Sequence, residues 1–256
     1  MDTPLISIII PTYNRADLLP EAVRSVIAQT FTDWELIVMD DSSTDNTEVI
    51  VDDFAQRDGR IRYFRHPKNV GIARNRNEGL AQAKGKLIAM LDSDDVWLDH
   101  DKLRMQAEYL ASHPDCVLVG TFASVIDTEG RDIGTFEFAT DDASIRAKML
   151  ARNQFVQSSL LYRKIPAMQV GGYDSSYTVA DDYDLWLKMG SEGSLANIPR
   201  YATGYREHGG GITKTRRVLA AREHLAIIRR HKKAYPKYFF AFIKAQLRIM
   251  LAYIKK

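Results

Sequence analysis

A short apolar strand that runs directly into a cluster of acids constrains this 256-residue chain more than any other feature. Leu87–Leu91 is a run of apolar residues, and Asp92-Ser93-Asp94-Asp95 follows it at once. An uninterrupted apolar run of this kind is typical of a parallel strand that is buried on both faces. Open α/β sheets bind their ligands at the carboxyl edge of such strands. We therefore expect the acids to lie at a ligand-binding edge.

Two interpretations of these acids are open. Three carboxylates this close together repel one another unless a cation lies between them. Oxygen ligands favour Mg2+ or Mn2+, and a diphosphate is a natural further ligand of the same ion. In the alternative, Asp92 caps the strand end, while Asp94 and Asp95 begin a solvated turn before a helix. The acidic motif alone does not separate the two.

Strand and helix patterns alternate along most of the chain. Buried strands are expected at residues 5–10, 34–39, 60–64, 87–91, 116–121 and 158–162, and helices at about 17–29, 47–57, 71–81, 103–112, 143–151 and 182–192. Residues 122–140 are expected to form an irregular hairpin, and the chain is helical from about Val218 to its end, with an interruption near Pro236. The alternation predicts an α/β fold in which helices flank a Rossmann-like, mostly parallel sheet, followed by a C-terminal helical extension.

Length and composition indicate the number of domains and the cellular compartment. The length suits one large α/β domain, or one domain with a helical appendage. The single cysteine, Cys116, rules out an internal disulfide and fits a reducing compartment. The N-terminal residues lack the pattern of a signal peptide, and no apolar run reaches the roughly 18–20 residues that span a bilayer. We expect a cytoplasmic protein.

The net charge of +2 hides an uneven distribution. Residues 214–256 carry 13 Lys or Arg and a single acid, Glu223, whereas residues 1–213 carry 22 basic and 32 acidic residues. In residues 238–254 apolar side chains alternate with Lys244 and Arg248, as in a basic amphipathic helix on an anionic membrane. This pattern places the protein peripherally on the inner face of the cell membrane, and we expect no nucleic acid partner. The alternatives are packing on the main domain and an oligomer contact.

A second pair of acids, Asp40-Asp41, follows the strand expected at residues 34–39. An Asp at this edge can accept a hydrogen bond from a nucleobase N–H or a ribose hydroxyl, and Tyr13 could stack on a base. In the structural alternative the acids cap a turn and Tyr13 packs on a helix. A receiver domain is disfavoured because it is about half this length. A Rossmann dehydrogenase is disfavoured because no G-x-G-x-x-G follows the first strand.

Several motifs occur together in one order and spacing. That set resembles the family 2 glycosyltransferases, which are inverting enzymes of GT-A fold, over roughly residues 4–213. The resemblance is specific to the family but not to a donor or an acceptor. Its motifs are Pro11-Thr12-Tyr13-Asn14, Asp40-Asp41-Ser42-Ser43-Thr44-Asp45, Asn69-Val70-Gly71, Arg76-Asn77, Leu91-Asp92-Ser93-Asp94-Asp95, Gly171-Gly172-Tyr173-Asp174 and Asp181-Asp182-Tyr183-Asp184-Leu185-Trp186.

The resemblance implies roles for the residues of the nucleotide side. Tyr13 and Asp41 would bind the base, and Pro11 and Thr12 would line the same pocket. Arg76 would lie near the nucleotide. Asp92 and Asp94 would form the DxD motif, in which the first Asp faces the ribose and the second holds Mn2+ or Mg2+ on the diphosphate. Asp95 would be an extra metal ligand or an acceptor-side carboxylate.

The resemblance also implies roles on the acceptor side. Asp182 would be the catalytic base, and Asp181 its acidic neighbour, whose charge would raise one pKa of the pair although the helix dipole favours ionisation. His208 would approach the metal or diphosphate, with Gly209-Gly210-Gly211 forming a mobile loop; a purely structural His is the alternative. Arg206 would pair with a phosphate or with Glu207. Trp186 would be a core or pocket-wall residue on the acceptor side.

Three positions depart from the family pattern. Ser42 replaces a glycine in the turn after Asp41, Asn75 replaces a small residue, and Asp181 replaces a Glu. The first two could alter the local backbone or the shape of the pocket. The third keeps an acid in place, so the assignment of Asp182 survives.

The resulting hypothesis is a metal-dependent inverting hexosyl- or N-acetylhexosaminyltransferase. It would move a sugar from a UDP-linked donor to a hydroxyl of a glycan or lipid-linked acceptor in surface polysaccharide synthesis. Residues 1–213 would form the catalytic domain, with a nucleotide-binding half at 1–115 and an acceptor half at 116–213, and residues 214–256 the basic extension. The alternatives are a nucleotidyltransferase, which would need a glycine-rich phosphate loop that Pro11–Arg15 does not offer, and a non-catalytic nucleotide-sugar binding module.

Overall fold

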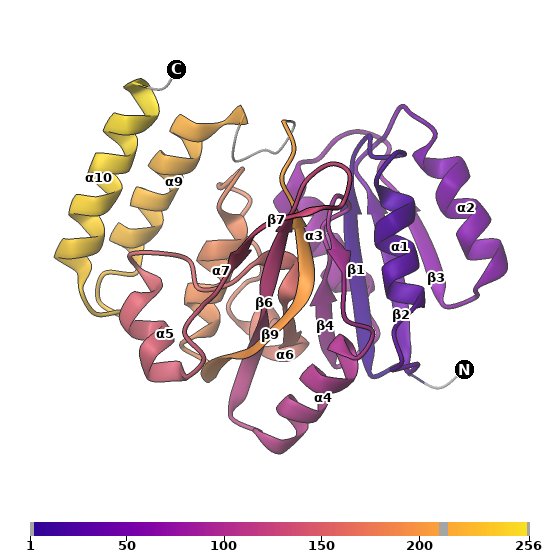
Figure 1. Ribbon diagram of the computed structural model, residues 1–256, viewed down its shortest axis with the longest axis horizontal. Coiled ribbons are helices and arrows are strands. Elements are labelled where there is room, and N and C mark those ends of the chain that lie inside the picture. Colours follow the sequence, from indigo (N-terminus) through magenta and orange to yellow (C-terminus); the bar gives the residue numbers. More distant parts are fainter. Residues whose placement is uncertain (1–2, 210–214, 255–256) are drawn as a thin grey trace.

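A mixed β-sheet forms the centre of the computed structural model, which describes residues 3–209 and 215–254 (Figure 1). Within the described residues its strands follow the order β3-β2-β1-β4-β8-β6-β9-β5, and β7 pairs with β6. The strands are β1 (Ile6–Thr12), β2 (Trp34–Asp40), β3 (Ile61–Arg65), β4 (Leu87–Met90), β5 (Val96–Trp97), β6 (Cys116–Ile126), β7 (Asp132–Phe136), β8 (Leu161–Arg163) and β9 (Ser194–Arg206). The helices are α1 (Leu19–Ile27), α2 (Thr47–Arg57), α3 (Ile72–Gln82), α4 (Lys102–Ser112), α5 (Asp142–Met149), α6 (Lys164–Gln169), α7 (Asp181–Met189), α9 (Arg217–Arg230) and α10 (Tyr238–Ile254).

The parallel half of the sheet is the part that the apolar runs predict. Strands β3, β2, β1 and β4 are all parallel, and Ile9 of β1 lies opposite both Ile37 and Met90. Side chains alternate between the two faces, because successive residues of a strand point to opposite sides. Ile9 belongs to a core cluster that includes residues of α3, α7, α9 and α10, whereas Ile8 and Ile10 belong to a second cluster with α1 and α4. The sheet is therefore buried on both faces, as continuous apolar strands require.

The other half of the sheet contains a strand that the sequence pattern does not reveal. β9 runs for 13 residues beside β6, and between Thr121 and Phe122 the register shifts so that Pro199 and Arg200 are left without a partner. A proline cannot donate to the ladder and is tolerated in a sheet mainly at such a bulge. No element was expected between residue 193 and Arg206, because β6 supplies hydrogen bonds that the local sequence does not indicate.

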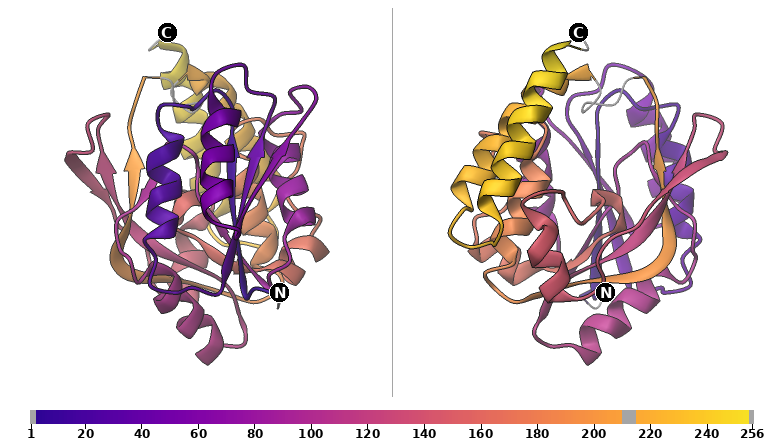
Figure 2. Two further views of the ribbon diagram at one scale, coloured as in Figure 1. Left: turned by 90° about the vertical axis from the view of Figure 1, so that its right-hand side faces the viewer. Right: turned by 60° about the vertical axis from the view of Figure 1, so that its left-hand side comes forward.

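The C-terminal extension is a pair of helices, as expected, with an interruption at residues 231–237. α9 packs on the main domain, with His224 stacked on Tyr183 of α7 at 4.6 Å between ring centroids, and α10 lies outside α9 (Figures 1 and 2). Ala241 and Ala245 of α10 are buried in the same cluster as α9. No helix among the described residues is both long enough and apolar enough to cross a bilayer.

Candidate functional site

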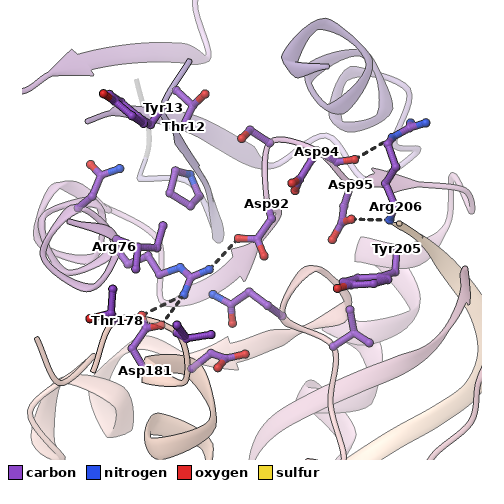
Figure 3. A pocket seen from close by; sticks show the side chains of 18 of the residues that line it. Thr12, Tyr13, Arg76, Asp92, Asp94, Asp95, Thr178, Asp181, Tyr205 and Arg206 are labelled. Atoms are coloured by element: carbon purple, nitrogen blue, oxygen red, sulfur yellow. Dashed lines mark hydrogen bonds and ion pairs between the residues drawn. The ribbon is translucent and has the colours of Figure 1, made fainter. Parts of the chain in front are cut away.

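The carboxyl ends of the parallel strands open into a cavity of about 780 Å³, seen from close by in Figure 3. Thr12 lies opposite Asp40 in the sheet register, so the ends of β1 and β2 reach this edge together. Other lining residues come from the segment after β4, the start of α7 and the end of β9. The expected site residues that line the cavity are Pro11, Thr12, Tyr13, Asp41, Arg76, Asp92, Asp94, Asp95, Asp181, Asp182, Arg206 and His208.

Tyr13 and Asp41 lie at the β1–β2 end of the cavity. Tyr13 is 48% exposed, so one face of its ring is accessible for stacking. Asp41 is buried, and its carboxylate accepts the backbone N–H groups of Val70, at 2.6 Å, and Gly71, at 2.9 Å. Ser42 adopts a φ of +70°, in the left-handed region that favours glycine. The turn thus keeps the backbone of the family's glycine although it carries a serine.

Arg76 joins two acids from distant parts of the chain. One guanidinium nitrogen lies 2.9 and 3.0 Å from the Asp181 carboxylate oxygens, and another lies 2.8 Å from Asp92 (Figure 3). Burial would lower the pKa of Arg76, but the two carboxylates raise it well above its usual value. The planar, permanently charged guanidinium suits a buried bridge of this kind. Arg76 therefore fixes the acidic start of α7 against the acidic segment after β4.

Asp94 and His208 form a second contact between distant segments. Nε2 of His208 lies 2.8 Å from Oδ2 of Asp94, and a guanidinium nitrogen of Arg15 lies 3.8 Å from the same oxygen. About a quarter of the Asp94 side chain remains exposed. His208 thus reaches the acidic motif. Gly210 and Gly211 of the expected mobile loop lie outside the described residues.

Asp95 and Arg206 are both bound to neighbouring protein groups, and Arg206 differs from the expectation in pairing with Glu21. The Asp95 oxygens accept hydrogen bonds from Ser158 Oγ, at 2.5 Å, and from the Arg206 backbone N–H, at 2.8 Å, so protein donors already use both. The buried Arg206 guanidinium pairs with Glu21 rather than Glu207, and also donates to backbone carbonyl oxygens, including that of Asp94. These contacts brace the acidic segment.

Asp182 is the titratable group best suited to accept a proton. Burial and the neighbouring Asp181 carboxylate raise the pKa of Asp182 to about 7, although Arg76 opposes the shift. One of its oxygens accepts the Tyr183 backbone N–H at 2.6 Å. The helix dipole, expected to favour ionisation, is thus outweighed by burial and the like charge. A carboxylate with a pKa near the working pH is well matched to general base catalysis.

The donor set at the acidic edge fits a divalent cation shared with a ligand. Among residues 3–209 and 215–254, no three His, Cys, Asp or Glu side chains form a ready-made metal cage. Mg2+ sites, however, commonly use only one or two protein carboxylates together with phosphate oxygens. The partly exposed Asp94 carboxylate beside His208 offers such a partial set, with Asp92 on the same segment.

Trp186 is a core residue rather than a pocket-wall residue. It is fully buried in the core between Tyr162 and Tyr173, with ring centroids 5.5 and 6.1 Å away, and it does not line the cavity. On α7 it follows Asp182 by four residues and so lies on the same side of the helix, but it packs in the core whereas Asp182 lines the cavity.

Sequence analysis missed three residues that shape the cavity. Arg15 approaches Asp94, and Ser158 binds both the Asp92 backbone N–H and the Asp95 carboxylate. Glu223 of α9 accepts the backbone N–H groups of residues 178–180, just before Asp181, at 2.8 to 3.0 Å. Glu223 could have been singled out as the lone acid of a basic segment, but no sequence signal indicates its partners.

Comparison with known proteins gives consistent relatives. A family model described as Glycosyl transferase family 2 matches residues 7–167. The glucosyltransferase WfgD of Escherichia coli, named as a UDP-Glc:alpha-D-GlcNAc-diphosphoundecaprenol beta-1,3-glucosyltransferase, is 29% identical over 206 residues, covering 77% of this chain and 74% of WfgD. An uncharacterized glycosyltransferase of Rickettsia bellii is 29% identical over 208 residues, or 81% of this chain. The chain spans only 29% of that relative's length.

Solved structures share the fold. The mannosyltransferase PcManGT of Pyrobaculum calidifontis, in complex with GDP-Man and Mn2+, has a TM-score of 0.71 at 20% identity, over 99% of this chain and 76% of its own. TarS 1-349 of S. aureus, in complex with UDP-GlcNAc, has a TM-score of 0.70 at 20% identity, over 87% of this chain and 66% of its own. These likenesses confirm the expected GT-A fold. Since the family model covers more than half of the residues, the chain belongs to glycosyl transferase family 2.

Proposed function

We propose that this protein is a metal-dependent inverting glycosyltransferase that moves a sugar from a UDP-linked donor to a hydroxyl of a glycan or lipid-linked acceptor during surface polysaccharide synthesis. One observation carries the proposal. The partly exposed Asp94 and the proton-accepting Asp182 line the same cavity, and Arg76 joins their two segments. A site of this chemistry can hold a nucleoside diphosphate at one side and deprotonate an alcohol at the other.

In this proposal each residue has a defined task. Tyr13 stacks on the base, and Asp41, whose oxygens keep lone pairs beyond the two backbone bonds, accepts from the base N–H. Asp94 and His208 would hold the divalent cation, which stabilises the negative charge of the leaving diphosphate. Asp182 takes the proton of the acceptor hydroxyl as it attacks C1 of the sugar. Attack from the face opposite the leaving group inverts the anomeric centre, as in inverting hydrolases.

Support for the finer points comes from the named relatives. WfgD is named for a UDP-Glc donor and a diphosphoundecaprenol-linked acceptor, and TarS was solved with UDP-GlcNAc. PcManGT was solved with GDP-Man and Mn2+, so the fold by itself also accommodates a guanine nucleotide. We infer a uridine nucleotide because WfgD, which is 29% identical to this chain, is named for a UDP-linked donor.

The donor is tested by thermal unfolding with UDP, dTDP and GDP sugars, each with Mn2+ or Mg2+. A ligand that binds only the folded state raises the melting temperature. We expect UDP sugars with either metal to give the largest increase and a chelator to abolish it. A shift with GDP sugars alone contradicts the inferred donor. UDP binding without turnover of any donor, and without an effect of Asp182→Ala, favours the non-catalytic binding module.

We also propose that α10 binds the inner face of the cell membrane. Its outer face exposes an apolar stripe, formed by Phe239, Phe240, Ile243, Leu247, Met250, Leu251 and Ile254. Lys244 and Arg248 lie beside this stripe, as in helices that insert shallowly into anionic bilayers.

The membrane proposal predicts that the protein pellets with phosphatidylglycerol vesicles and that the double variant Ile243→Glu/Leu247→Glu does not. Val49→Glu, which changes an equally exposed apolar residue on α2, is the matched control and should pellet like the wild type. Equal pelleting of the double variant and the control would contradict the proposal.

A further inference from the structure

A second cavity, of about 490 Å³, lies beside the first, between α5, the segment before it and the start of α10. Four cations line it, namely Lys148, Arg152, Lys237 and Lys244, together with the aromatic rings of Phe138 and Phe240. We call it the cationic cavity. α5 and the start of α10 come from segments about 90 residues apart, so only the fold brings these charges together.

Cations outnumber acids in the lining of the cationic cavity by four to one, the acid being Glu137. None of the four cations forms an ion pair with any residue in the described part of the chain. The acid in the lining, Glu137, instead accepts the Tyr201 hydroxyl. Arg152 lies over the Phe138 ring, 5.6 Å from its centroid, which leaves its guanidinium edge available. Clustered cations without partners repel one another, and an anion between them would relieve that repulsion.

The position of the cationic cavity relates it to two other features. Phe138 and Arg152 line both this cavity and the larger one that contains Asp182. At its other side, Phe240 and Lys244 belong to α10, whose apolar stripe begins at Phe239. The order in space is therefore a reaction cavity, then a group of cations, then an apolar surface.

This order matches the chemistry of one class of molecule. A sugar joined through a phosphate or diphosphate to an apolar chain has a hydroxyl for Asp182, an anion for the cations and a hydrocarbon for α10. Lysine and arginine bind phosphate oxygens through charge-assisted hydrogen bonds. The diphosphate of a sugar nucleotide is a poorer match, because its metal-binding edge at Asp94 lies in the larger cavity.

We propose that the cationic cavity is the acceptor subsite and binds the phosphate or diphosphate that links the acceptor sugar to its apolar chain. The inference rests on the proposed glycosyl transfer, and it adds the acceptor class. A neutral glycan acceptor would leave the four cations without a partner.

The test uses octyl phosphate below its critical micelle concentration as the probe, with the full chain and without donor or metal. Binding is measured by calorimetry for the wild type and for Lys148→Glu/Lys244→Glu, which reverses two exposed charges of the cavity. The matched control is Lys232→Glu/Lys233→Glu, which makes the same change of net charge on exposed residues of the extension outside the cavity. We expect the control to bind like the wild type and the cavity variant to bind at least tenfold more weakly.

Two further measurements separate the possible explanations. Octyl glucoside, a neutral molecule with the same chain, should bind all three proteins weakly and equally; binding as tight as that of octyl phosphate would overturn the proposal. Equal loss of octyl phosphate binding in both double variants would do the same, because it indicates a general charge effect. UDP with Mn2+ should bind all three alike. If no donor is turned over, the proposed glycosyl transfer is wrong. Weaker binding of octyl phosphate by the cavity variant alone would still show that the cationic cavity binds a phosphate.

Discussion

The acidic edge of the sheet and the cationic cavity carry opposite charges, and they differ still more in how those charges are partnered. At the acidic edge the protein supplies partners: backbone amides for Asp41, a guanidinium for Asp92, and a hydroxyl and an amide for Asp95. The cations of the second cavity have no ion-pair partner within residues 3–209 and 215–254. The first region is held in one geometry before any ligand arrives, whereas the second has charge available to attract one.

This difference suggests a division of labour. Precise chemistry requires groups that are fixed within a fraction of an ångström, and the paired acids meet that need. Binding a flexible acceptor requires attraction and tolerance, which flexible lysine side chains at the surface provide. The predictions below test this contrast, from the largest effect to the smallest.

Removing the base should have the largest effect. Asp182→Asn keeps the shape of the side chain but cannot take a proton, and general base catalysis typically contributes about 10²–10⁴-fold to the rate. We expect kcat to fall by about that factor, while UDP affinity is unchanged. Initial rates and calorimetry measure the two quantities. Asp53→Asn, on exposed α2, should change neither, and an active Asp182→Asn would remove this residue from the mechanism.

Breaking the buried bridge should mainly affect stability. Arg76→Met leaves the buried Asp181 without its partner and Asp92 without its guanidinium, and loss of one partner of a buried pair costs about 3–5 kcal/mol. Arg57→Met breaks the exposed pair with Asp53 and should cost about 1 kcal/mol or less. Urea unfolding gives both values. Similar losses in the two variants would mean that the acidic edge does not depend on its buried partners.

Glu223 is the acid of the basic extension that holds the loop before Asp181. Glu223→Ala leaves the backbone N–H groups of residues 178–180 unsatisfied, which should cost about 1–3 kcal/mol. Because Asp182 follows this loop, kcat should fall more than UDP affinity. Glu108→Ala, an exposed acid on α4, is the control. A loss of stability with unchanged kcat would restrict Glu223 to a structural role.

The pH dependence should report Asp182. Its pKa is raised to about 7, so kcat/KM should fall about tenfold per unit as the pH drops below 7, because the protonated form is no base. Stability should change in the opposite direction. Since the folded state holds this proton more tightly than the unfolded state, this residue makes folding less favourable as the pH rises from about 4 to 7. Both trends should be weaker in Asp182→Asn, and an unchanged rate profile would refute the assignment.

The local sequence indicates much of the donor-side architecture. Strands β1, β2 and β4 are covered on both faces, and this burial is visible in the sequence as runs of mostly apolar residues. The acids after β2 and β4 had to share an edge because parallel strands end on the same side. The family resemblance led us to expect Asp94 and Asp182 in one site. Hydrophobic periodicity could not, because it relates only residues that are close in sequence.

Other features depended on partners far along the chain. The sequence did not indicate that Ser158 and the Arg206 backbone N–H brace the Asp95 carboxylate, because these donors lie 63 and 111 residues away. Whether Trp186 lies in the core or on the pocket wall was left open by the sequence, and contacts with Tyr162 and Tyr173 place it in the core. β9 was missed because its ladder with β6 tolerates a proline bulge that local patterns do not indicate.

The amino-acid sequence by itself determined the order of most strands and helices, the acidic edge and the basic, amphipathic end of the chain. Only the tertiary structure decided which acids are paired, which cations remain unpaired and which surfaces adjoin the reaction cavity. The physical reason is that the periodicity of buried side chains is visible within a few consecutive residues. Charge compensation instead acts between atoms of residues that can be more than 100 positions apart, as Arg76 and Asp181 are.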